Sequence, residues 1–325
     1  MKALLSPLRS LVAGLYSWLP VSVDRRVRVI VWVTLAVQIL IVGTGGAVRL
    51  TGSGLGCPTW PRCTADSFVA LPEQGIHGVI EFGNRLLTFV LVIVAILAFL
   101  FVVRLRRNRR DLFGLAIAIG AGIPAQAVLG GITVRTGLNP YVVGAHFIVS
   151  IVIVALSAIF VFRAYYGPRS RVRVVPVWVV ATAHLASLFV ALSIVMGVLT
   201  TGSGPHAGDA NTPRNGLNSE VLQHLHSYPG YIAVGLTAVL VSAAIALRAR
   251  RIRSFAVGLL AVEAVQVAVG IIQSRLGLPE LLVGIHMVLA CVVVAVMTAL
   301  VLSLRSPVAA PVPAVAAERP VAAIR

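Results

Sequence analysis

The chain has 325 residues, of which 58% are hydrophobic and 11% are charged, and its mean hydropathy is +0.98. Soluble domains average roughly 45–50% apolar and about 25% charged residues, so this composition excludes a water-soluble enzyme as well as disordered and fibrous proteins. Lysine and arginine number 27 against 10 acidic residues, a formal net charge of +17. The basic residues lie in short clusters between apolar runs, which is typical of a protein oriented in a membrane and not of a nucleic-acid binder. The sequence therefore predicts an all-α polytopic membrane protein.

Eight apolar segments are long enough to cross a bilayer, which takes about 20 residues per helix. They cover residues 29–48, 77–103, 112–133, 141–163, 175–199, 221–247, 255–273 and 281–304. Arginine clusters fall in alternate connections, beginning with the one before the first segment. By the positive-inside rule, both termini face the cytoplasm, and the longer glycine-rich connections 49–76 and 200–220 face outward. The expected location is the cell membrane.

Two further segments flank the predicted spans. Residues 1–28 contain a short apolar run, Leu11 to Leu19, without a clear small-x-small cleavage site. This pattern predicts an uncleaved interfacial segment on the cytoplasmic side and not a signal peptide. Residues 305–325 are rich in alanine, proline and valine, and we expect them to form a disordered cytoplasmic tail.

An internal repeat divides the chain into two halves. Residues 125–146 read AQAVLGGITVRTGLNPYVVGAH and residues 265–286 read VQVAVGIIQSRLGLPELLVGIH, with identities at a constant offset of 140. Four predicted spans in each half indicate two pseudo-symmetric parallel four-helix bundles, residues 29–163 and residues 174–304. The repeat pairs Gln126 with Gln266, Gly130 with Gly270, Arg135 with Arg275, and His146 with His286.

Ionisable residues inside the predicted spans are costly in a bilayer and are therefore functional candidates. The second span of each half carries such residues in its first turns. The fourth span of each half carries a histidine about 10 Å below the outer surface, at about 1.5 Å of rise per residue. Imidazoles on facing helices of a bundle are the usual way to hold haem iron from both sides. The candidates are His77, Glu81, Arg85, His146, His184, His224, His226, Glu263 and His286.

The repeated histidine favours haem ligation by His286 together with a histidine of the sixth span. His226 is the first choice for that partner. His224 lies two residues away, about 200° around a helix, so only one of the two can face the interior. For any single histidine, the alternative is a buried side chain that is hydrogen-bonded to a neighbouring carbonyl. His184 has no counterpart in the repeat and is interpreted as a packing residue, and His206 as a solvated loop residue.

The first outward connection contains Cys57-Pro-Thr-Trp-Pro-Arg-Cys63. This spacing can close a disulfide in an oxidising compartment, either as a structural staple or as a redox-active pair. Arg135 and Arg275, at matching places on the outer rim, suit carboxylates such as haem propionates, or alternatively anchor the protein at the headgroups. Glu263 is interpreted as a buried, hydrogen-bonded acid.

Taken together, these motifs resemble the haem A synthase family. They are GTGGAVRLTGSGLGCPTWPRC after the first span, IEFGNRLL in the second, GGITVRTG before the fourth, and the paired histidines of the second half; the resemblance covers about residues 29–304. That family is an eight-span, two-bundle oxidoreductase that converts the C8 methyl group of haem O to the formyl group of haem A for cytochrome c oxidase. The resemblance implies a resident haem b in the C-terminal half, ligated by His226 and His286. Its propionates are the carboxylates that we expect Arg275 to bind. It implies the haem O substrate in the N-terminal half, near Glu81 and His146.

One position departs from the family pattern. The family's second span reads Glu-x-x-His-Arg, and this chain matches it at Glu81 and Arg85 but has Asn84 in place of the histidine. His77 lies about 10 Å along the helix from Asn84 and cannot replace the missing ligand without a shift of the haem. The substrate iron is therefore held by His146 alone, or His77 takes a different position. The expected substrate site consists of His77, Asn84, Arg85, Arg135 and His146.

Glu81 is the expected catalytic residue. Oxidation of a methyl group beside a porphyrin builds positive charge at that carbon, and a carboxylate in a low-dielectric site can stabilise this charge. The alternative is a structural pair with Arg85, one turn further along the helix. Cys57 and Cys63 match the family's redox-linked pair. The resemblance also implies haem O synthase and cytochrome c oxidase assembly factors as partners, and it leaves the oligomeric state open.

Two other classes of protein compete with an enzyme. A bis-histidine b-type membrane cytochrome that acts only as an electron carrier requires four well-paired histidines. A transporter requires polar groups near the midplane, beside broken helices. In this sequence the candidate ligands gather near one face, and one half lacks a clean histidine pair. The sequence therefore favours the oxidoreductase.

Overall fold

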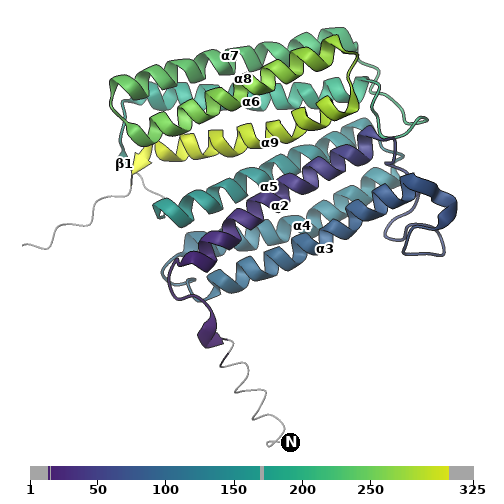
Figure 1. Ribbon diagram of the computed structural model, residues 1–325, viewed down its shortest axis with the longest axis horizontal. Coiled ribbons are helices and arrows are strands. Elements are labelled where there is room, and N and C mark those ends of the chain that lie inside the picture. Colours follow the sequence, from purple (N-terminus) through teal and green to yellow (C-terminus); the bar gives the residue numbers. More distant parts are fainter. Residues whose placement is uncertain (1–13, 15, 169–171, 307–325) are drawn as a thin grey trace, which may run out of the picture.

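The computed structural model describes residues 14, 16–168 and 172–306, and long helices dominate it (Figure 1). Within these residues, eight helices are long and apolar enough to cross a membrane. The chain is therefore a multi-pass membrane protein, and the predicted number of spans is confirmed. The helices are α2 (Arg25–Leu50), α3 (Gly75–Val103), α4 (Arg110–Arg135), α5 (Pro140–Tyr166), α6 (Val177–Ser203), α7 (Ser219–Ala246), α8 (Arg250–Arg275) and α9 (Glu280–Ser303).

Polar caps explain where several of these helices begin. Asp24 caps α2, because its Oδ1 accepts a hydrogen bond from the Val27 N–H at 3.1 Å. Asn139 and Asn218 cap α5 and α7 in the same way. A side-chain oxygen at this position satisfies backbone N–H groups that the helix itself leaves free. The caps lie outside the apolar runs, so α2 begins at Arg25, before the predicted span.

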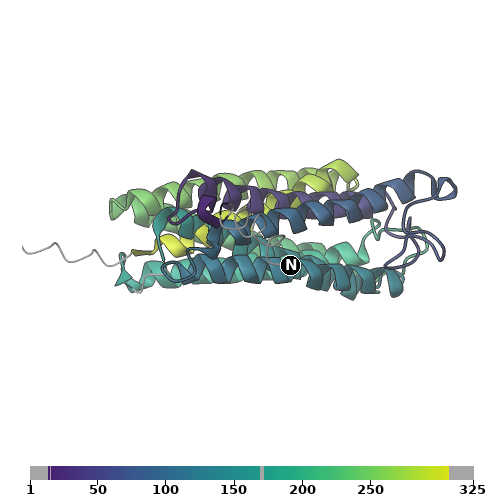
Figure 2. The same ribbon diagram turned by 90° about the horizontal axis from the view of Figure 1, so that it is seen from below.

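The helices form two groups of four. In the first group, α2 and α4 each contact α3 and α5; in the second, α6 and α8 each contact α7 and α9. Figure 1 shows α6 to α9 on one side and α2 to α5 on the other, with roughly parallel axes, and Figure 2 shows the same elongated molecule from below. The groups meet through α5 against α9, α2 against α9 and α5 against α6. These groups correspond to the two expected bundles, and their pseudo-symmetry stays a prediction.

The two ends of the molecule carry different connections. The long connections 51–71 and 204–218 lie together at the right of Figure 1, which we call the long-loop end. The short connections 104–109 and 247–249 lie at the opposite end, together with most of the arginine clusters, and we call this the arginine-rich end. The segregation of arginines to one end agrees with the alternate spacing of basic clusters in the sequence.

Hydrogen bonds join the two groups at the long-loop end. Arg49, in the last turn of α2, donates from Nε to the His206 carbonyl at 2.7 Å and from Nη2 to the Thr201 carbonyl at 3.0 Å. The Gly54 N–H donates to the Gly208 carbonyl at 2.8 Å. The connection after α6 is thus held by residues of the N-terminal half.

A short strand pair lies at the arginine-rich end. β1 (Val172–Arg173) pairs antiparallel with β2 (Arg305–Ser306). The first two residues of the expected disordered tail, 305–325, are therefore paired with the connection between the halves. Residues 307–325 lie outside the described residues, as do residues 1–13 and 15 of the predicted interfacial segment.

The hydrophobic core is divided between the two helix groups. One cluster of buried side chains belongs mainly to α2, α3, α4 and α5 and includes Val31 and Phe160. The other belongs to α6, α7, α8 and α9 and includes Leu240 and Leu300. Large apolar side chains on the outer faces are exposed, as in Phe89 at 68%. This distribution is expected of a bundle whose outer surface is covered by lipid.

Candidate functional site

Two clusters of polar side chains lie within about three turns of the long-loop end, one in each helix group. We call them the N-site and the C-site. The N-site consists of Glu81, Asn84, Arg85 and His146, on α3 and α5. The C-site consists of Ser193, His226 and His286, on α6, α7 and α9.

At the C-site, His226 lies beside His286, with the two ring centroids 5.9 Å apart. His226 Nδ1 donates to the Ser193 carbonyl at 2.8 Å. Because a carbonyl oxygen can only accept, Nδ1 carries the proton and Nε2 is left with a lone pair. His224 is exposed and stacks on Tyr228, with ring centroids 5.8 Å apart. Of the two histidines that the sequence left open, His226 is the one beside His286.

Glycines allow α6 and α8 to approach these two rings closely. A Cβ atom at Gly197 would lie 2.8 Å from His226 Cε1, and one at Gly270 would lie 3.2 Å from His286 Cε1. The first distance is shorter than a carbon–carbon contact allows, so any side chain at Gly197 would displace the ring. Helix backbone therefore sets the orientation of the imidazoles from one side.

The C-site residues fit an iron held between two imidazoles. Both side chains are part-buried, and an imidazole with a free lone pair is a common ligand of haem iron. The hydrogen bond from His226 to the Ser193 carbonyl is the kind of outer contact that fixes a ligating ring. The described residues contain no group of three or more His, Cys, Asp or Glu side chains that could hold a metal. The C-site offers two imidazole side chains, His226 and His286, and a haem iron can take two protein ligands.

At the N-site, Glu81 is 5% exposed, and both of its carboxylate oxygens accept hydrogen bonds. Oε2 accepts from the Cys57 N–H at 2.7 Å. Oε1 accepts from Arg85 Nε at 3.2 Å and from Arg85 Nη2. Arg85 also donates to the carbonyls of Cys57, Thr59 and Arg62. The ion pair therefore holds the loop that follows α2 against α3.

The same loop is closed by a disulfide between Cys57 and Cys63, both of which are buried. Between them, Trp60 lies against α4. The Arg135 guanidinium is 5.9 Å from the centroid of the Trp60 ring, and Arg135 Nη2 donates to the Trp60 carbonyl at 3.2 Å. Arg275, the counterpart of Arg135 in the repeat, is exposed, and its side chain forms no ion pair or hydrogen bond within the described part of the chain.

The remaining residues of the expected substrate site contact separate partners. Asn84 Oδ1 accepts from Thr44 Oγ1 at 2.8 Å, which ties α3 to α2. His77 is exposed, and its Nδ1 lies 2.9 Å from Ser53 Oγ. No hydrogen bond or ring contact between described residues joins His146 to Asn84 or to His77. The structure brings Glu81 and Arg85 together but does not bring these other residues into one contact set.

One arrangement recurs in both halves. Gln126 Nε2 donates to the His146 carbonyl at 3.1 Å, and Gln266 Nε2 donates to the His286 carbonyl at 3.1 Å. Nδ1 of both histidines and Oε1 of both glutamines are buried, with no hydrogen-bond partner among the residues described. A Cβ atom at Gly130 would lie 3.4 Å from His146 Cε1, as the matching glycine's would lie 3.2 Å from His286 Cε1. The repeated residues therefore make equivalent contacts.

The sequence interpretation missed some of the residues that position the site. The Ser193 carbonyl accepts a hydrogen bond from His226 Nδ1, and Thr44 Oγ1 donates one to Asn84 Oδ1. Ser193 belongs to none of the motifs described above, and Thr44 lies inside the segment GTGGAVRLTGSGLGCPTWPRC without standing out from it. Each residue lies far along the chain from its partner, so no local signal marked the contact. The two repeated glutamines did carry a signal, since they recur at the same offset as the histidines.

Three other polar residues lie outside the two clusters. His184, interpreted as a packing residue, is exposed, because the buried face of α6 runs through Ala183 and Ala186. His206, interpreted as a solvated residue, is half-buried, and its Nε2 lies 2.8 Å from the Leu278 carbonyl. Glu263 is a buried acid, as interpreted, and its Oε1 accepts from Thr237 Oγ1 at 3.2 Å.

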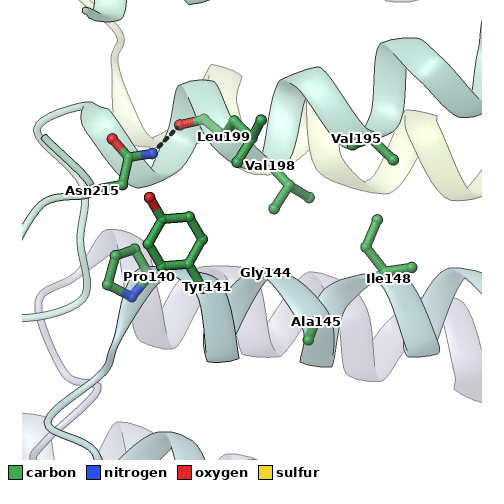
Figure 3. Close-up of a pocket in the computed structure, with 9 residues that line it drawn as sticks. All are labelled: Pro140, Tyr141, Gly144, Ala145, Ile148, Val195, Val198, Leu199 and Asn215. Atoms are coloured by element: carbon green, nitrogen blue, oxygen red, sulfur yellow. Dashed lines mark hydrogen bonds between the residues drawn. The ribbon is translucent and has the colours of Figure 1, made fainter. Parts of the chain in front are cut away.

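A small apolar pocket lies between α5 and α6, where the helix groups meet (Figure 3). Its volume is about 200 Å³, below the roughly 300–1,000 Å³ of most ligand sites. Figure 3 shows Asn215 at one end, donating to the Leu199 carbonyl at 2.8 Å, with Tyr141, Val198 and Ile148 among the lining side chains. The pocket is too small for a porphyrin and is not part of either site.

A known protein family matches most of this chain, and curated relatives match about half of it. Residues 28–298 match the family model COX15-CtaA, described as cytochrome oxidase assembly protein. A relative from Listeria monocytogenes, named Heme A synthase, is 28% identical over 179 residues, 52% of this chain and 57% of that protein. A Heme A synthase from Geobacillus kaustophilus is 33% identical over 132 residues, 40% of each chain. The chain thus spans about half the length of these curated relatives.

Proposed function

We propose, from the premise that this chain belongs to the cytochrome oxidase assembly protein family, that it is an oxidoreductase of haem A biosynthesis. The proposed reaction converts the C8 methyl group of haem O to the formyl group of haem A, the form that cytochrome c oxidase uses. Support comes from the curated relatives named Heme A synthase. Further support comes from the two polar clusters at one end of a membrane-spanning protein.

In this proposal, His226 and His286 would hold the iron of a resident haem b at the C-site. The facing rings, 5.9 Å apart, and the free lone pair on His226 Nε2 support this assignment. When bound, the haem supplies an iron centre that accepts and releases single electrons. Arg275 is the proposed partner of a haem propionate, since its guanidinium has no acidic partner within the described residues and a guanidinium suits a carboxylate.

The haem O substrate is proposed to lie in the N-terminal half, with His146 as the ligand of its iron. Asn84 occupies the position of the second family ligand. Its amide oxygen is taken by Thr44, so its NH₂ group is the part that remains to donate to a substrate. Arg135 and His77 are assigned to the rim of the same site.

Glu81 is the proposed catalytic residue. Its carboxylate is held by N–H groups of Cys57 and Arg85, so its negative charge stays in one place. A fixed charge in a site of low dielectric stabilises the positive charge that develops on a methyl carbon as electrons leave it. Arg85 offsets part of that charge and connects the carboxylate to the loop carbonyls, and we assign it as a positioning residue.

The arginine clusters support one orientation in the membrane. We propose that the arginine-rich end and both termini face the cytoplasm, and that both sites open toward the outer side of the cell membrane. The disulfide would then lie in an oxidising compartment, and the contacts of its loop with Glu81 and Arg85 support a structural role for it. The proposed partners are haem O synthase, which makes the substrate, and the assembly factors of cytochrome c oxidase.

The buried carboxylate of Glu81 is the observation that favours an enzyme over an electron carrier. A bis-histidine carrier needs a histidine pair in each half. The N-site has Asn84 on its second helix, and no contact within the described residues pairs His146 with another imidazole. A carrier also has no use for the buried carboxylate of Glu81, which lies within three turns of the long-loop end.

Expression in a host that makes haem O but no haem A tests the proposal. Haem extracted from membranes is separated by chromatography, and the same host without the chain serves as control. We expect haem A only where the chain is present, together with haem b in the purified protein. Haem b without any haem A or oxidised intermediate would favour the carrier, and the absence of all haem would contradict both.

A further inference from the structure

An open groove at the arginine-rich end has no part in either site. It lies between the first turns of α2 and the end of α5, and its volume is about 610 Å³. The α2 residues that line it recur at three- and four-residue intervals, so they share one face of the helix. It is lined by Val23, Asp24, Arg25, Arg28, Val29, Trp32, Val33 and Tyr165.

Two arginines at the mouth of the groove carry uncompensated positive charge. Arg25 and Arg28 are both exposed, and neither forms an ion pair with any described residue. The Arg28 guanidinium lies 5.3 Å from the centroid of the Tyr165 ring, which leaves its N–H groups free at the edges. The mouth therefore offers two guanidinium groups on adjacent turns of one helix.

The acid beside these arginines is already engaged. Asp24 Oδ2 accepts from Arg26 Nε at 2.8 Å, and Oδ1 accepts from the Val27 N–H as the cap of α2. Partial burial acts to raise the pKa of Asp24, but the hydrogen bonds from Val27 and Arg26 outweigh it and lower this pKa below its usual value. Asp24 thus stays a carboxylate paired with Arg26, and it neutralises neither arginine of the groove.

Further from the mouth, the groove becomes apolar and aromatic. Val29 and Trp32 are each 52% exposed, and Val33 is 37% exposed. Trp32 Nε1 donates to the Tyr165 hydroxyl at 3.1 Å, which fixes the indole across the groove. Trp32 lies about 10 Å along the helix axis from Arg25, a depth at which aromatic side chains are typical of the membrane interface. The groove therefore passes from a cationic mouth to an apolar floor inside the bilayer.

We propose that this groove binds one anionic phospholipid, with its phosphate at Arg25 and Arg28 and an acyl chain along Val29 and Val33. Guanidinium groups bind phosphate through paired hydrogen bonds, and basic residues near a membrane surface attract anionic headgroups. Only a ligand with both a net negative head and a hydrocarbon chain complements both parts of the groove. A zwitterionic lipid lacks the net charge, and inorganic phosphate lacks the chain.

Quenching of Trp32 fluorescence by brominated lipids tests this proposal. The full chain is placed in bilayers of phosphatidylcholine that contain a minor share of either brominated phosphatidylglycerol or brominated phosphatidylcholine. Bromine on an acyl chain quenches an indole that it touches, and the Trp32→Phe variant identifies the share of the signal that belongs to Trp32. We expect the anionic lipid to be preferred by roughly fivefold for each arginine, the size expected for one basic residue at an anionic surface.

Charge variants identify the source of the preference. Arg25→Gln combined with Arg28→Gln should abolish it, whereas Arg107→Gln combined with Arg110→Gln, which removes the same charge elsewhere at this end, should keep it. Equal quenching by the two brominated lipids in the wild-type protein would overturn the proposal, and so would equal losses in the two double variants. Displacement of brominated phosphatidylglycerol by inorganic phosphate would show a phosphate site and overturn the lipid assignment. The wild-type comparison decides selectivity even if the groove variant does not fold.

Discussion

The two halves of the molecule share the contacts between their third and fourth helices but differ in the side chains that the second helix contributes. In both halves, a glutamine of the third helix donates to the carbonyl of a histidine on the fourth, and a glycine faces the histidine ring. The second helix contributes His226 in the C-terminal half, but Glu81, Asn84 and Arg85 in the N-terminal half. A second imidazole therefore lies beside the repeated histidine in the C-terminal half, whereas the second helix of the N-terminal half carries a buried ion pair that contacts the loop after α2.

The connection after the first helix of each half differs as well. In the N-terminal half it is closed by Cys57 and Cys63 and is held by Glu81 and Arg85. In the C-terminal half it contains no cysteine, and Asn215 fastens it by donating to the Leu199 carbonyl. A covalent closure is therefore found only where the loop is bonded to the candidate catalytic carboxylate.

Loss of either C-site imidazole should have the largest effect. His226→Ala and His286→Ala should each remove or strongly perturb the b-type absorption spectrum of the purified protein, because alanine cannot ligate iron and the other imidazole is left alone. Absorption spectra and haem-to-protein ratios measure this loss. His224→Ala is the matched control and should keep the spectrum. If both C-site variants retained normal spectra and haem content, the proposed ligands would be wrong.

Removal of the charge at the N-site should lower product formation next most strongly. Glu81→Gln keeps the shape and most of the hydrogen bonding of the side chain, so it should retain haem b while making roughly 100- to 1,000-fold less haem A. Glu81→Asp should be less affected, because it keeps the charge. The yield of haem A in a haem O-producing host measures both.

Glu263→Gln is the control for that experiment, since it neutralises the other buried carboxylate in the spans, which lies in the C-terminal half. We expect it to leave haem A formation close to normal. A normal haem A yield from Glu81→Gln would contradict the catalytic role. Loss of haem b from the same variant would instead favour the structural pairing with Arg85.

Opening the disulfide should have an intermediate effect. In the chain-entropy model, a cross-link that closes so short a loop raises the free energy of unfolding by about 2 kcal/mol. Cys57→Ser combined with Cys63→Ser should therefore make the loop easier for a protease to cut. Thiol labelling of the wild-type protein should detect these two cysteines only after reduction. Cys291 is a free, buried cysteine, so its labelling should not depend on reduction and serves as the internal reference. Full labelling before reduction would exclude the bond. An unchanged yield of haem A in the double variant would show that the disulfide has only a structural role.

A methyl group beside a C-site ring should have the smallest effect. Gly197→Ala places a Cβ against His226, so we expect haem b to be retained with a shifted spectrum and a stability below that of a matched variant. Gly235→Ala is that variant, because a Cβ there meets nothing within 4 Å, and replacing a helix glycine with alanine should stabilise it by about 1 kcal/mol. Identical spectra and melting temperatures for the two variants would show that the close approach of α6 does not determine the orientation of the His226 ring.

The membrane spans and some of the site residues can be predicted from the sequence for physical reasons. A bilayer requires long apolar runs, so the sequence alone indicates eight helices, and the repeat marks His286 as a candidate ligand. The rotation of each helix is harder to predict, because spans that are apolar on all sides have no polar face to indicate which residues point inward. For this reason the packing role predicted for His184 is wrong, and the sequence does not separate His224 from His226. The bond from Cys57 to Glu81 depends on how a loop folds back, which no periodic pattern encodes.

The bonds of Arg49 set an order of events during synthesis. Its carbonyl partners lie 152 and 157 residues further along the chain. A ribosome that adds roughly 5–20 residues per second makes them about 8 to 30 s after Arg49 itself. Throughout that interval, the guanidinium at the end of α2 must be satisfied by water or by lipid headgroups. The first four helices therefore enter the membrane with their long-loop end unfinished, and synthesis that stops before Thr201 leaves a product that lacks both of these partners.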